Sequence, residues 1–293
     1  AAKDQRFTVI HQPNAGIAGA RNAAYPFIKG EYTLFVDDDD TIEPDLCEKT
    51  VAVADAEQTD TTYFLIDNGQ KRRRDNKRLY LWGHQVAGLI GKDPLIENDY
   101  LILLRYPFIW AKLWRTCFLL DNDIRCPTGQ YCEDDFMNWK TLVHHPKIAL
   151  LPKVMYHHRN YSLSTSHEPS KKYLMGVPAT LDLIKEMLLE TGNYHGMWKR
   201  LFLQHKILNF RATYSHLPVY RQAEFLRSVK DRIGWNEQEY LLQKNKLKRH
   251  VRVFYYSLMG SRFAAVENTF YIALRKTEIL FRKYRDKLLK RAG

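Results

Sequence analysis

The chain has 293 residues, of which 45% are hydrophobic and 13% aromatic. This length allows one large domain or two modest ones with a buried core, and the composition excludes an intrinsically disordered protein. The longest apolar run, residues 100–114, is interrupted by charged residues and a proline, so the sequence predicts no membrane span. The four cysteines are far apart or at spacings unlike a zinc site, which predicts reduced thiols.

The net charge of +12 is concentrated at the C-terminal end of the chain. Residues 241–293 hold 14 Lys or Arg against three Asp or Glu. Within them, residues 264–291 repeat large apolar side chains at steps of three or four with cations between, as an amphipathic cationic helix does. Such a surface suits an anionic membrane or a lipid-phosphate acceptor, and packing on the rest of the protein is the alternative. We find no nucleic-acid-binding signature and expect no nucleic acid partner.

Short strands and helices alternate through the first part of the sequence. Three β-branched or aromatic runs predict strands, and the stretches between them have helical character with Gly or Pro near their ends. The predicted strands are residues 7–11, 31–36 and 61–66, and the predicted helices are residues 19–30 and 43–57. Alternation at this spacing predicts an α/β fold with a mainly parallel sheet.

The character of the sequence changes near residue 170. Strand signals fade there, and long stretches with helical periodicity follow, such as residues 173–192. We therefore predict an α/β domain over residues 1–170 and a helical, basic region over residues 171–293.

Four consecutive acids, Asp37 to Asp40, follow the second predicted strand. Ligands of α/β sheets bind at the carboxyl ends of the strands, which is where these side chains lie. Because side chains alternate along an extended chain, Asp37 and Asp39 point to one side. Two such oxygen donors suit Mg²⁺ or Mn²⁺, with phosphate oxygens completing the shell. An acidic loop without a ligand is the alternative.

Two enzyme classes use an apolar strand that ends in D-x-D. Asp37, Asp39 and Thr41 resemble the D-x-D-x-T motif of haloacid-dehalogenase-type phosphatases, in which the first Asp is a nucleophile. The same acids resemble the D-x-D of GT-A glycosyltransferases, which binds the metal and diphosphate of a nucleotide sugar. The motif alone does not separate the two classes.

The sequence around the acids resembles the inverting family-2 glycosyltransferases. The stretch NAGIAGARNAAYPFIKGEYTLFVDDDD, residues 14–40, is similar to that family's N-x-G-x-x-x-A-R-N helix, which leads through K-G-E-Y into a strand and D-x-D-D. One departure is Asp38, where a small Ser or Ala is commoner in the family.

Two later segments extend the resemblance. Residues 108–142 look like the acceptor-side segment, in which a W-x-K-L-[YW]-R run precedes an E-D pair that opens a helix, with Cys126 where Phe is usual. Residues 148–165 resemble the closing strand and its Y-x-x-R loop. The resemblance covers residues 7–168 and implies a GT-A fold. A phosphatase would need later Lys and acidic motifs, of which we find no convincing set.

The resemblance implies a division of labour among the acids. Asp134 would be the general base that takes the proton of the acceptor hydroxyl, with Glu133 orienting it or the acceptor. Mn²⁺ or Mg²⁺ held by Asp39, with Asp37 in support, would stabilise the diphosphate leaving group. Attack opposite that group would invert the anomeric centre. Acids placed against a helix dipole are the alternative explanation of the E-D pair.

Other polar residues are assigned roles by the same resemblance. At most one of the two adjacent histidines can face the metal, since neighbours on a strand face opposite ways, and both are ordinary strand histidines in the alternative view. Arg21 equally suits a structural ion pair, and Trp110 equally suits a core. The expected donor-binding residues are Asn14, Gly19, Arg21, Asn22, Asp37, Asp38 and Arg159; the acceptor-binding residues are Trp110 and Lys112; and the metal-binding residues are Asp37, Asp39, His157 and His158.

The N-terminal motifs of the family, a P-x-Y-N-like phrase and an Asp-rich turn that grips the nucleotide base, do not occur here. We therefore expect the first βαβ unit to be missing. The predicted function is transfer of a sugar from a nucleotide diphosphate sugar, with a UDP-sugar as the expected donor, to a glycan or lipid-linked acceptor in cell-surface polysaccharide synthesis. The expected location is cytoplasmic, on the inner membrane face. A phosphatase using Asp37 and Asp39 and a non-catalytic sugar- or membrane-binding module are the alternatives.

Overall fold

The computed structural model describes residues 4–67, 85–86, 88–89, 95–129, 131–159 and 171–234. The chain divides into two compact units, Ala1–Leu201 and Phe202–Gly293. The change in sequence character near residue 170 coincides with the start of a long helix inside the first unit. The basic helix expected at residues 264–291 lies outside the described residues and stays a prediction.

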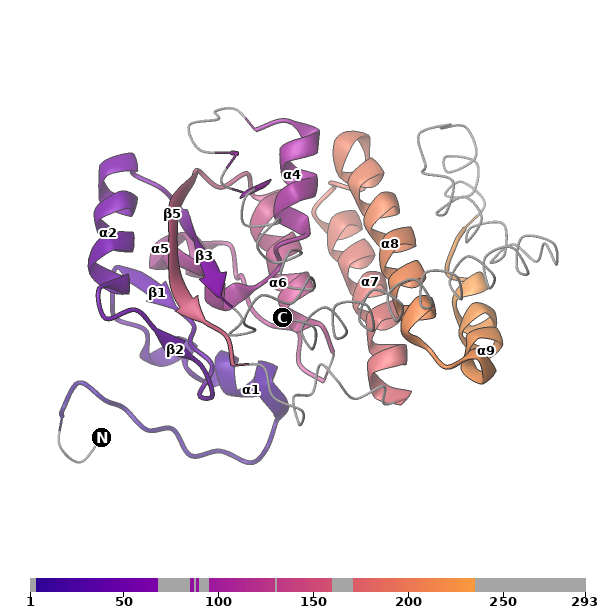
Figure 1. The fold of residues 1–293 in the computed structure, drawn as a ribbon, viewed down its shortest axis with the longest axis horizontal. Coiled ribbons are helices and arrows are strands. Elements are labelled where there is room, and N and C mark those ends of the chain that lie inside the picture. The colour runs from indigo at the N-terminus through magenta and orange to yellow at the C-terminus, as the bar shows by residue number, and fades with distance from the viewer. Residues whose placement is uncertain are drawn as a thin grey trace, which may run out of the picture. The chain divides into compact units, whose positions relative to one another are not determined.

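A five-stranded sheet forms the centre of the first unit (Figure 1). Its strand order is β1-β4-β3-β5-β2. The strands are β1 (Tyr32–Leu34), β2 (Thr41–Ile42), β3 (Thr61–Asp67), β4 (Lys112–Arg115) and β5 (Ile148–His157). The α/β class is confirmed, but the expectation of a mainly parallel sheet is wrong for the described strands. β3 and β5 run parallel, whereas β4 is antiparallel to β1 and β3, and β2 is antiparallel to β5.

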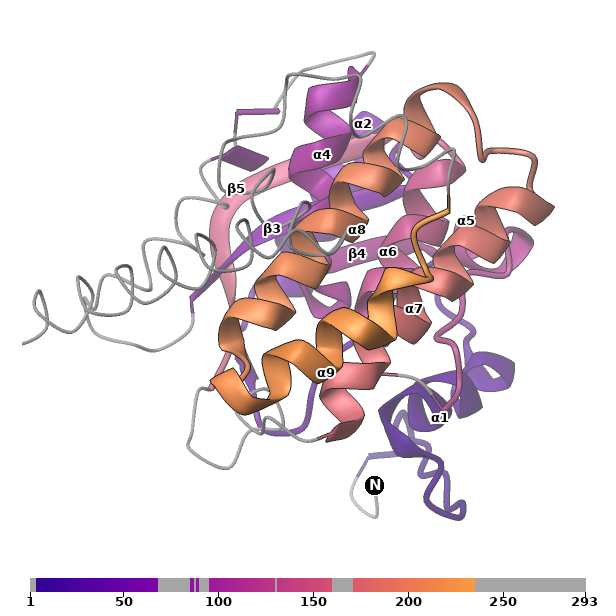
Figure 2. The same ribbon diagram turned by 90° about the vertical axis from the view of Figure 1, so that its right-hand side faces the viewer.

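The strand expected at residues 7–11 does not form. The segment is extended and lies on the outside of the first unit, with Phe7 67% and Val9 59% exposed (Figures 1 and 2). A strand exists only where its backbone groups pair with a neighbour, and none of the described strands runs beside this segment. The loss of this strand removes one of the parallel partners that the alternation pattern predicted.

β3 and β5 form the buried middle of the sheet. β3 is buried along nearly its whole length, as expected for an apolar strand covered on both faces. The register of β5 against β3 skips Pro152 and Lys153. Proline has no N–H for the ladder, so an irregularity at this point costs little pairing. Beyond it, β5 continues to Tyr156 and His157, which lie beside the acidic loop.

Helices cover both sides of the sheet (Figure 1). α2 (Leu46–Glu57) packs on β5 and β3, and α4 (Glu97–Leu104) and α6 (Glu133–Val143) lie on the opposite side. α7 (Lys171–Glu190) packs on α6. The approach is close at Gly176, where an added Cβ would lie 2.4 Å from the Cβ of Tyr131, just before α6. The short helices are α1 (Gly16–Ala23), α5 (Thr116–Asp121), η1 (Tyr25–Phe27) and η2 (Ile109–Ala111).

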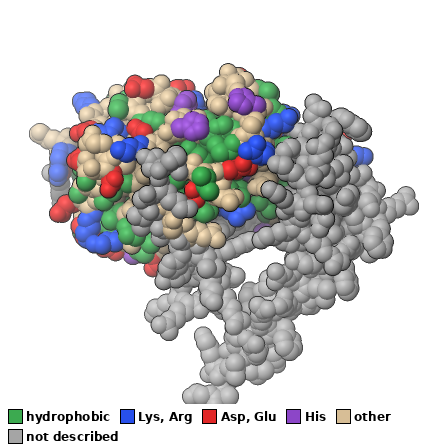
Figure 3. All heavy atoms as spheres, turned by 90° about the horizontal axis from the view of Figure 1, so that it is seen from above, with side chains coloured by type: hydrophobic (Ala, Val, Ile, Leu, Met, Phe, Trp, Pro, Cys, Tyr) green, Lys and Arg blue, Asp and Glu red, His purple; other side chains and the backbone are tan. Residues whose placement is uncertain are grey.

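The described part of the second unit is helical. It contains most of α8 (Gly196–His216) and all of α9 (Val219–Lys230), which begins directly after Pro218. Phe210 and Phe225 meet edge to face between these helices. Over the described residues, acidic, basic and hydrophobic side chains are interspersed on the face seen in Figure 3. Within the described ranges, no helix combines the length and apolar character needed to cross a bilayer.

Candidate active site

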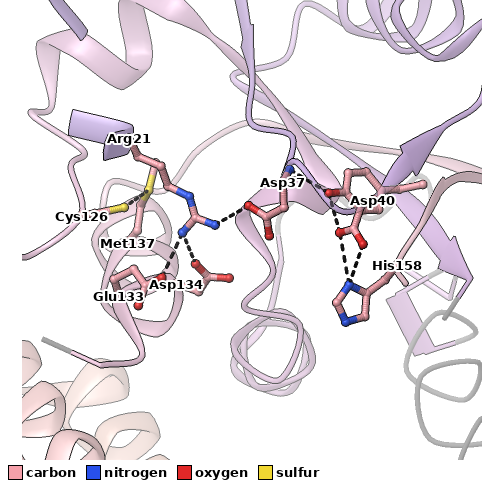
Figure 4. Close-up of polar contacts among 9 residues, drawn as sticks. Arg21, Asp37, Asp40, Cys126, Glu133, Asp134, Met137 and His158 are labelled. Carbon is pink, nitrogen blue, oxygen red and sulfur yellow. Dashed lines mark hydrogen bonds and ion pairs between the residues drawn. The ribbon is translucent and has the colours of Figure 1, made fainter. Parts of the chain in front are cut away.

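Arg21 on α1 joins acids from two distant parts of the chain (Figure 4). Its Nη2 donates to Asp37 Oδ1 at 2.8 Å, and its Nη1 donates to Glu133 Oε1 at 3.1 Å and Asp134 Oδ1 at 2.9 Å. The Arg21 side chain is only 11% exposed. One guanidinium therefore connects the acidic loop after β1 with the first turn of α6. The donor-side and base-side residues expected from the sequence lie at one site.

The start of α1 is shaped by two residues from the expected donor-binding set. The Asn14 side chain accepts a hydrogen bond from the Gly16 N–H at 2.9 Å, and Gly16 has a left-handed φ of 71°. Gly19 is buried, and a Cβ there would lie 2.4 Å from the Cβ of Ala15. Both residues therefore fix the local path that aims Arg21. A contact of either residue with a donor stays a prediction.

Asn22 anchors α1 to the segment before α6. Its amide donates to the Cys126 carbonyl at 2.7 Å, and its Oδ1 accepts from the Cys126 N–H at 3.1 Å. This two-way pairing with the backbone explains why an amide side chain suits the position. The structure thus gives Asn22 a supporting contact, and its expected donor contact stays a prediction.

The carboxylates of α6 lie where a helix favours negative charge. Cys132 precedes the helix in a left-handed conformation with φ 63°, and Glu133, Asp134 and Asp135 fill its first turn. The partial positive charge of a helix N-terminus stabilises acids there, typically by about 0.3–1 kcal/mol. The dipole and Arg21 together hold Glu133 and Asp134 beside the loop. The helix dipole therefore favours these acids, and their contacts with Arg21 are a separate feature that the dipole does not explain.

The site raises the pKa values of both Asp134 and Arg21, which has opposite consequences for their charges. Burial, together with the charges of Glu133 and Asp37, raises the pKa of Asp134 to about 7 against the opposing attraction of Arg21. For Arg21, burial lowers the pKa, but the Asp134 and Asp37 carboxylates outweigh it and raise the pKa overall. Arg21 is therefore a permanent cation, while Asp134 can exchange a proton near neutral pH.

Asp40, to which the sequence analysis gave no role, ties the acidic loop to the end of β5. Its side chain is fully buried. It accepts hydrogen bonds from the Tyr156 hydroxyl at 2.8 Å and the Arg159 backbone N–H at 2.7 Å, and both its oxygens lie 3.1 Å from His158 Nδ1. The Tyr156 oxygen also accepts from the Asp37 N–H at 3.0 Å. Residues 37–40 form a turn in which the Asp40 N–H donates to the Asp37 carbonyl at 3.3 Å, so the alternation expected of an extended chain is wrong for these acids.

The two adjacent histidines are separated by the strand end, as their alternation predicts. His158 lies beside Asp40 on the Asp37 side of the loop (Figure 4). His157 contacts Glu43 through Nε2 at 2.6 Å and has Asp67 3.8 Å from Nδ1. Both ring nitrogens of His157 therefore face structural carboxylates.

The structure places the expected acceptor-binding residues in the interior. Trp110 is buried and stacks on Tyr156 at 4.6 Å and on His158 at 5.3 Å between ring centroids. Lys112 is completely buried, and its Nζ donates to Asn138 Oδ1. Burial lowers the pKa of Lys112 to about 7, although Asp134 and Asp135 act in the other direction. These positions correct the acceptor assignment, because neither side chain offers an open surface to a sugar.

The remaining expected site residues lie at the rim of the site. Asp38 and Arg159 are exposed, and Asp39 is half-buried. Arg159 donates its backbone N–H to Asp40, and its side chain is exposed.

The donor types at the acidic loop fit Mn²⁺ or Mg²⁺. Carboxylate oxygens of Asp37 and Asp39 and the imidazole of His158 are ligands that these ions take. Among the described residues, no three His, Cys, Asp or Glu side chains lie close enough together to hold an ion by themselves. An ion that carries a nucleotide diphosphate needs fewer protein ligands, because phosphate oxygens and water complete its shell.

The site thus combines an acidic loop at one end of a mixed sheet with a carboxylate pair at the start of a helix. Residues 1–114 match the family model Glycosyl transferase family 2. The chain aligns with two proteins of Bacillus subtilis (strain 168) that carry glycosyltransferase names. EpsH is 27% identical over 179 residues, which are 59% of this chain and 50% of EpsH; EpsJ is 25% identical over 181 residues, which are 58% and 50%.

A solved structure shows the fold. The crystal structure of S. aureus TarS 1–349 in complex with UDP-GlcNAc superposes with a TM-score of 0.57 at 16% identity, covering 92% of this chain and 74% of that one. Residues 1–114 are thus similar to glycosyl transferase family 2, and the chain has a GT-A-type fold. The chain spans about half the length of the curated relatives it matches.

Proposed function

We propose that this protein transfers a sugar from a nucleotide diphosphate sugar to a hydroxyl group, with metal dependence and inversion at the anomeric carbon. The observation that carries the proposal is the Arg21 bridge between Asp37, after β1, and Asp134, at the start of α6. It supports a site in which a diphosphate-binding loop and a base act on the same bond.

Asp134 is the base of the proposed reaction. The acceptor hydroxyl gives its proton to the Asp134 carboxylate while its oxygen bonds to the anomeric carbon. The bond from that carbon to the diphosphate oxygen breaks, and its electron pair leaves with the diphosphate. A pKa of about 7 keeps Asp134 available as a proton acceptor near neutral pH, where general bases work best. Such a base contributes on the order of 10²–10⁴-fold to the rate.

Arg21 and the acidic loop serve the leaving group. Arg21 holds Asp134 and Asp37 in a fixed relation and stays charged throughout the cycle. A divalent cation, when bound, would neutralise the charge that grows on the diphosphate. Tyr156 holds the Asp37 backbone, and Asp40 holds the loop against β5, so the loop is in place before a donor arrives.

The donor and acceptor classes rest on chemistry and on the relatives. TarS was crystallised with UDP-GlcNAc, which supports a UDP-sugar as the donor. The basic C-terminal residues 241–293 favour an acceptor that carries lipid phosphate, at the inner face of the cell membrane. A role in cell-surface polysaccharide synthesis follows from that acceptor class.

The test is a screen of nucleotide sugars for thermal stabilisation of the full chain that depends on Mn²⁺, followed by a transfer assay with the best donor. We expect Asp39→Ala to abolish the stabilisation by donor and Asp134→Ala to keep it but stop transfer. The matched control is Asp123→Ala, which removes an exposed acid near α6 whose ion-pair partners among the described residues are Arg125 and Lys140. Undiminished metal-dependent donor binding in Asp39→Ala would refute the metal assignment, and transfer by Asp134→Ala would refute the base.

A further inference from the structure

Asp40 is the acid of the loop with the least exposure and the most complete set of partners. One oxygen, Oδ1, accepts from the Arg159 backbone N–H at 2.7 Å, and the other, Oδ2, accepts from the Tyr156 hydroxyl at 2.8 Å. Each oxygen also lies 3.1 Å from His158 Nδ1. Both carboxylate oxygens are thus engaged by the end of β5. Asp40 has no oxygen left for direct coordination of an ion.

The contact with Asp40 dictates where His158 carries its hydrogen. An ionised carboxylate accepts hydrogen bonds and cannot donate one, so Nδ1 must be the donor. In a neutral imidazole the other nitrogen, Nε2, then keeps its lone pair. Within the described part of the chain, Nε2 makes no hydrogen bond.

The orientation of the ring is fixed as well as its tautomer. The Trp110 ring stacks on His158 at 5.3 Å and 19°, and on Tyr156 at 4.6 Å and 25°. Tyr156 in turn holds both Asp40 and the Asp37 backbone. Trp110, which the sequence analysis assigned to the acceptor, is therefore buried against Tyr156 and His158, the two side chains that contact Asp40. Figure 4 shows the carboxylate of Asp40 beside the His158 ring.

We propose that Asp40 is a positioning residue that fixes His158 with its hydrogen on Nδ1, so that the Nε2 lone pair is presented to the divalent cation of the donor complex. A carboxylate that orients a ligating histidine in this way typically changes metal affinity by about 10–100-fold when it is removed. The statement about the cation rests on the proposed function, whereas the statement about the tautomer does not.

A second histidine provides an internal comparison. His157 is also paired with a carboxylate, but its contact with Glu43 is made through Nε2 and its Nδ1 faces Asp67. Neither nitrogen is presented to the acidic loop. Glu43→Gln is therefore a matched control, since it weakens a carboxylate–histidine pair on the neighbouring residue without touching His158.

The experiment is long-range ¹H–¹⁵N correlation NMR on the uniformly ¹⁵N-labelled full chain at pH 8, with the His158 signals assigned by their loss in His158→Asn. We expect wild-type His158 to show the pattern of a hydrogen on Nδ1. In Asp40→Asn, the side chain offers one amide oxygen where Asp40 has two carboxylate oxygens. The Tyr156 hydroxyl, the Arg159 N–H and His158 Nδ1 must then compete for it, so the His158 pattern should shift toward a hydrogen on Nε2. Glu43→Gln should leave the His158 pattern as in the wild type.

The wild-type spectrum alone can overturn the proposal, whatever happens to the folding of the variants. A His158 hydrogen on Nε2 in the wild type would contradict it, as would an unchanged pattern in Asp40→Asn. The second measurement is paramagnetic broadening of the His158 signals by Mn²⁺ in the presence of UDP. We expect broadening in the wild type, and a roughly tenfold higher Mn²⁺ concentration for the same broadening in Asp40→Asn.

The outcomes separate this inference from the proposed function. If Mn²⁺ with UDP binds by calorimetry but leaves His158 unbroadened, the presentation of Nε2 to the cation is wrong. If His158 behaves as expected but no nucleotide sugar is turned over by the wild-type chain, the proposed reaction fails and the role of Asp40 stands.

Discussion

Arg21 is the residue on which most of the site depends. Its guanidinium makes hydrogen bonds to three carboxylates while only 11% of the side chain is exposed. A planar fork of donors can serve several acids at once, which a lysine cannot do. Removing such a cation would leave three acids facing one another in a sheltered corner. The resulting repulsion acts on stability and on the geometry of catalysis together.

We expect Arg21→Ala to lower the free energy of unfolding by about 3–5 kcal/mol and to abolish transfer, because removing one partner of a buried ion pair leaves the other charges uncompensated. Arg21→Lys should recover part of the stability but little activity, since it keeps the charge and loses the fork. Chemical denaturation and a transfer assay measure both. Arg6→Ala is the control, because Arg6 is exposed and pairs only with Asp4. Wild-type activity in Arg21→Ala would contradict the role given to the bridge.

The raised pKa of Asp134 predicts a pH dependence of stability with a definite sign. The pKa rises from 3.8 to about 7 on folding, so the folded state binds the extra proton between these values. The stabilisation from that proton is fully present below about pH 3.8 and is lost as the pH rises through about 7. Wild-type stability should therefore fall from pH 5 to pH 8 more steeply than that of Asp134→Asn. Thermal unfolding of both proteins at the two pH values measures the difference, and parallel curves would contradict it.

The same pKa predicts an activity profile. If Asp134 accepts the proton, kcat/KM should rise with pH through an apparent pKa of about 7 and then level off. Initial rates between pH 5.5 and 8.5 at fixed Mn²⁺ provide the test. A rate that is flat through this range would show that another group takes the proton.

At the scale of elements, α1 positions Arg21. It has only eight residues, so its direction depends on contacts at its start. Gly19 allows α1 to lie against Ala15, where any larger residue would meet the Ala15 Cβ. A short helix that is displaced at one end moves the side chain at the other end, and the Arg21 bridge tolerates little displacement.

We therefore expect Gly19→Ala to reduce transfer at least tenfold and to cost about 1–3 kcal/mol of stability, the range of overpacked sites. Gly234→Ala is the control, since no atom of the described residues lies within 4 Å of a Cβ placed at Gly234. The two variants are compared by thermal unfolding and by transfer rate. A Gly19→Ala protein with wild-type rate would show that α1 adapts without moving Arg21.

Elements with a strong local pattern were predictable from the sequence, and those that depend on a distant partner were not. The strand at residues 61–66 and the helix at residues 43–57 correspond to β3 and α2 with shifts of at most three residues. The strand at residues 7–11 was predicted from the same kind of pattern and fails, because pairing depends on a neighbour. The prediction that Lys112 binds the acceptor was wrong for a related reason. Its motif is local, but its burial depends on Tyr63 of β3 and Asn138 of α6.

At the scale of the whole molecule, the uneven charge is the main feature. Residues 241–293 carry most of the net charge, while the described surface mixes both signs (Figure 3). We expect the full chain to float with vesicles containing phosphatidylserine and not with neutral vesicles, and to be released by salt, because screening weakens attraction between exposed charges. A chain ending at residue 234 should lose the binding. Equal flotation of both chains would place the attraction elsewhere.

The Arg21 bridge also sets an order of events during synthesis. Its partners Glu133 and Asp134 are separated from it by 112 and 113 residues. On a ribosome, α1 is made before α6. Arg21 can therefore pair with Asp37 before Glu133 and Asp134 have been synthesised. Contacts that close such long loops form late in folding. The proposed active site is thus complete only once α6 has been made, and a nascent chain interrupted before α6 would carry the proposed donor loop without the proposed base.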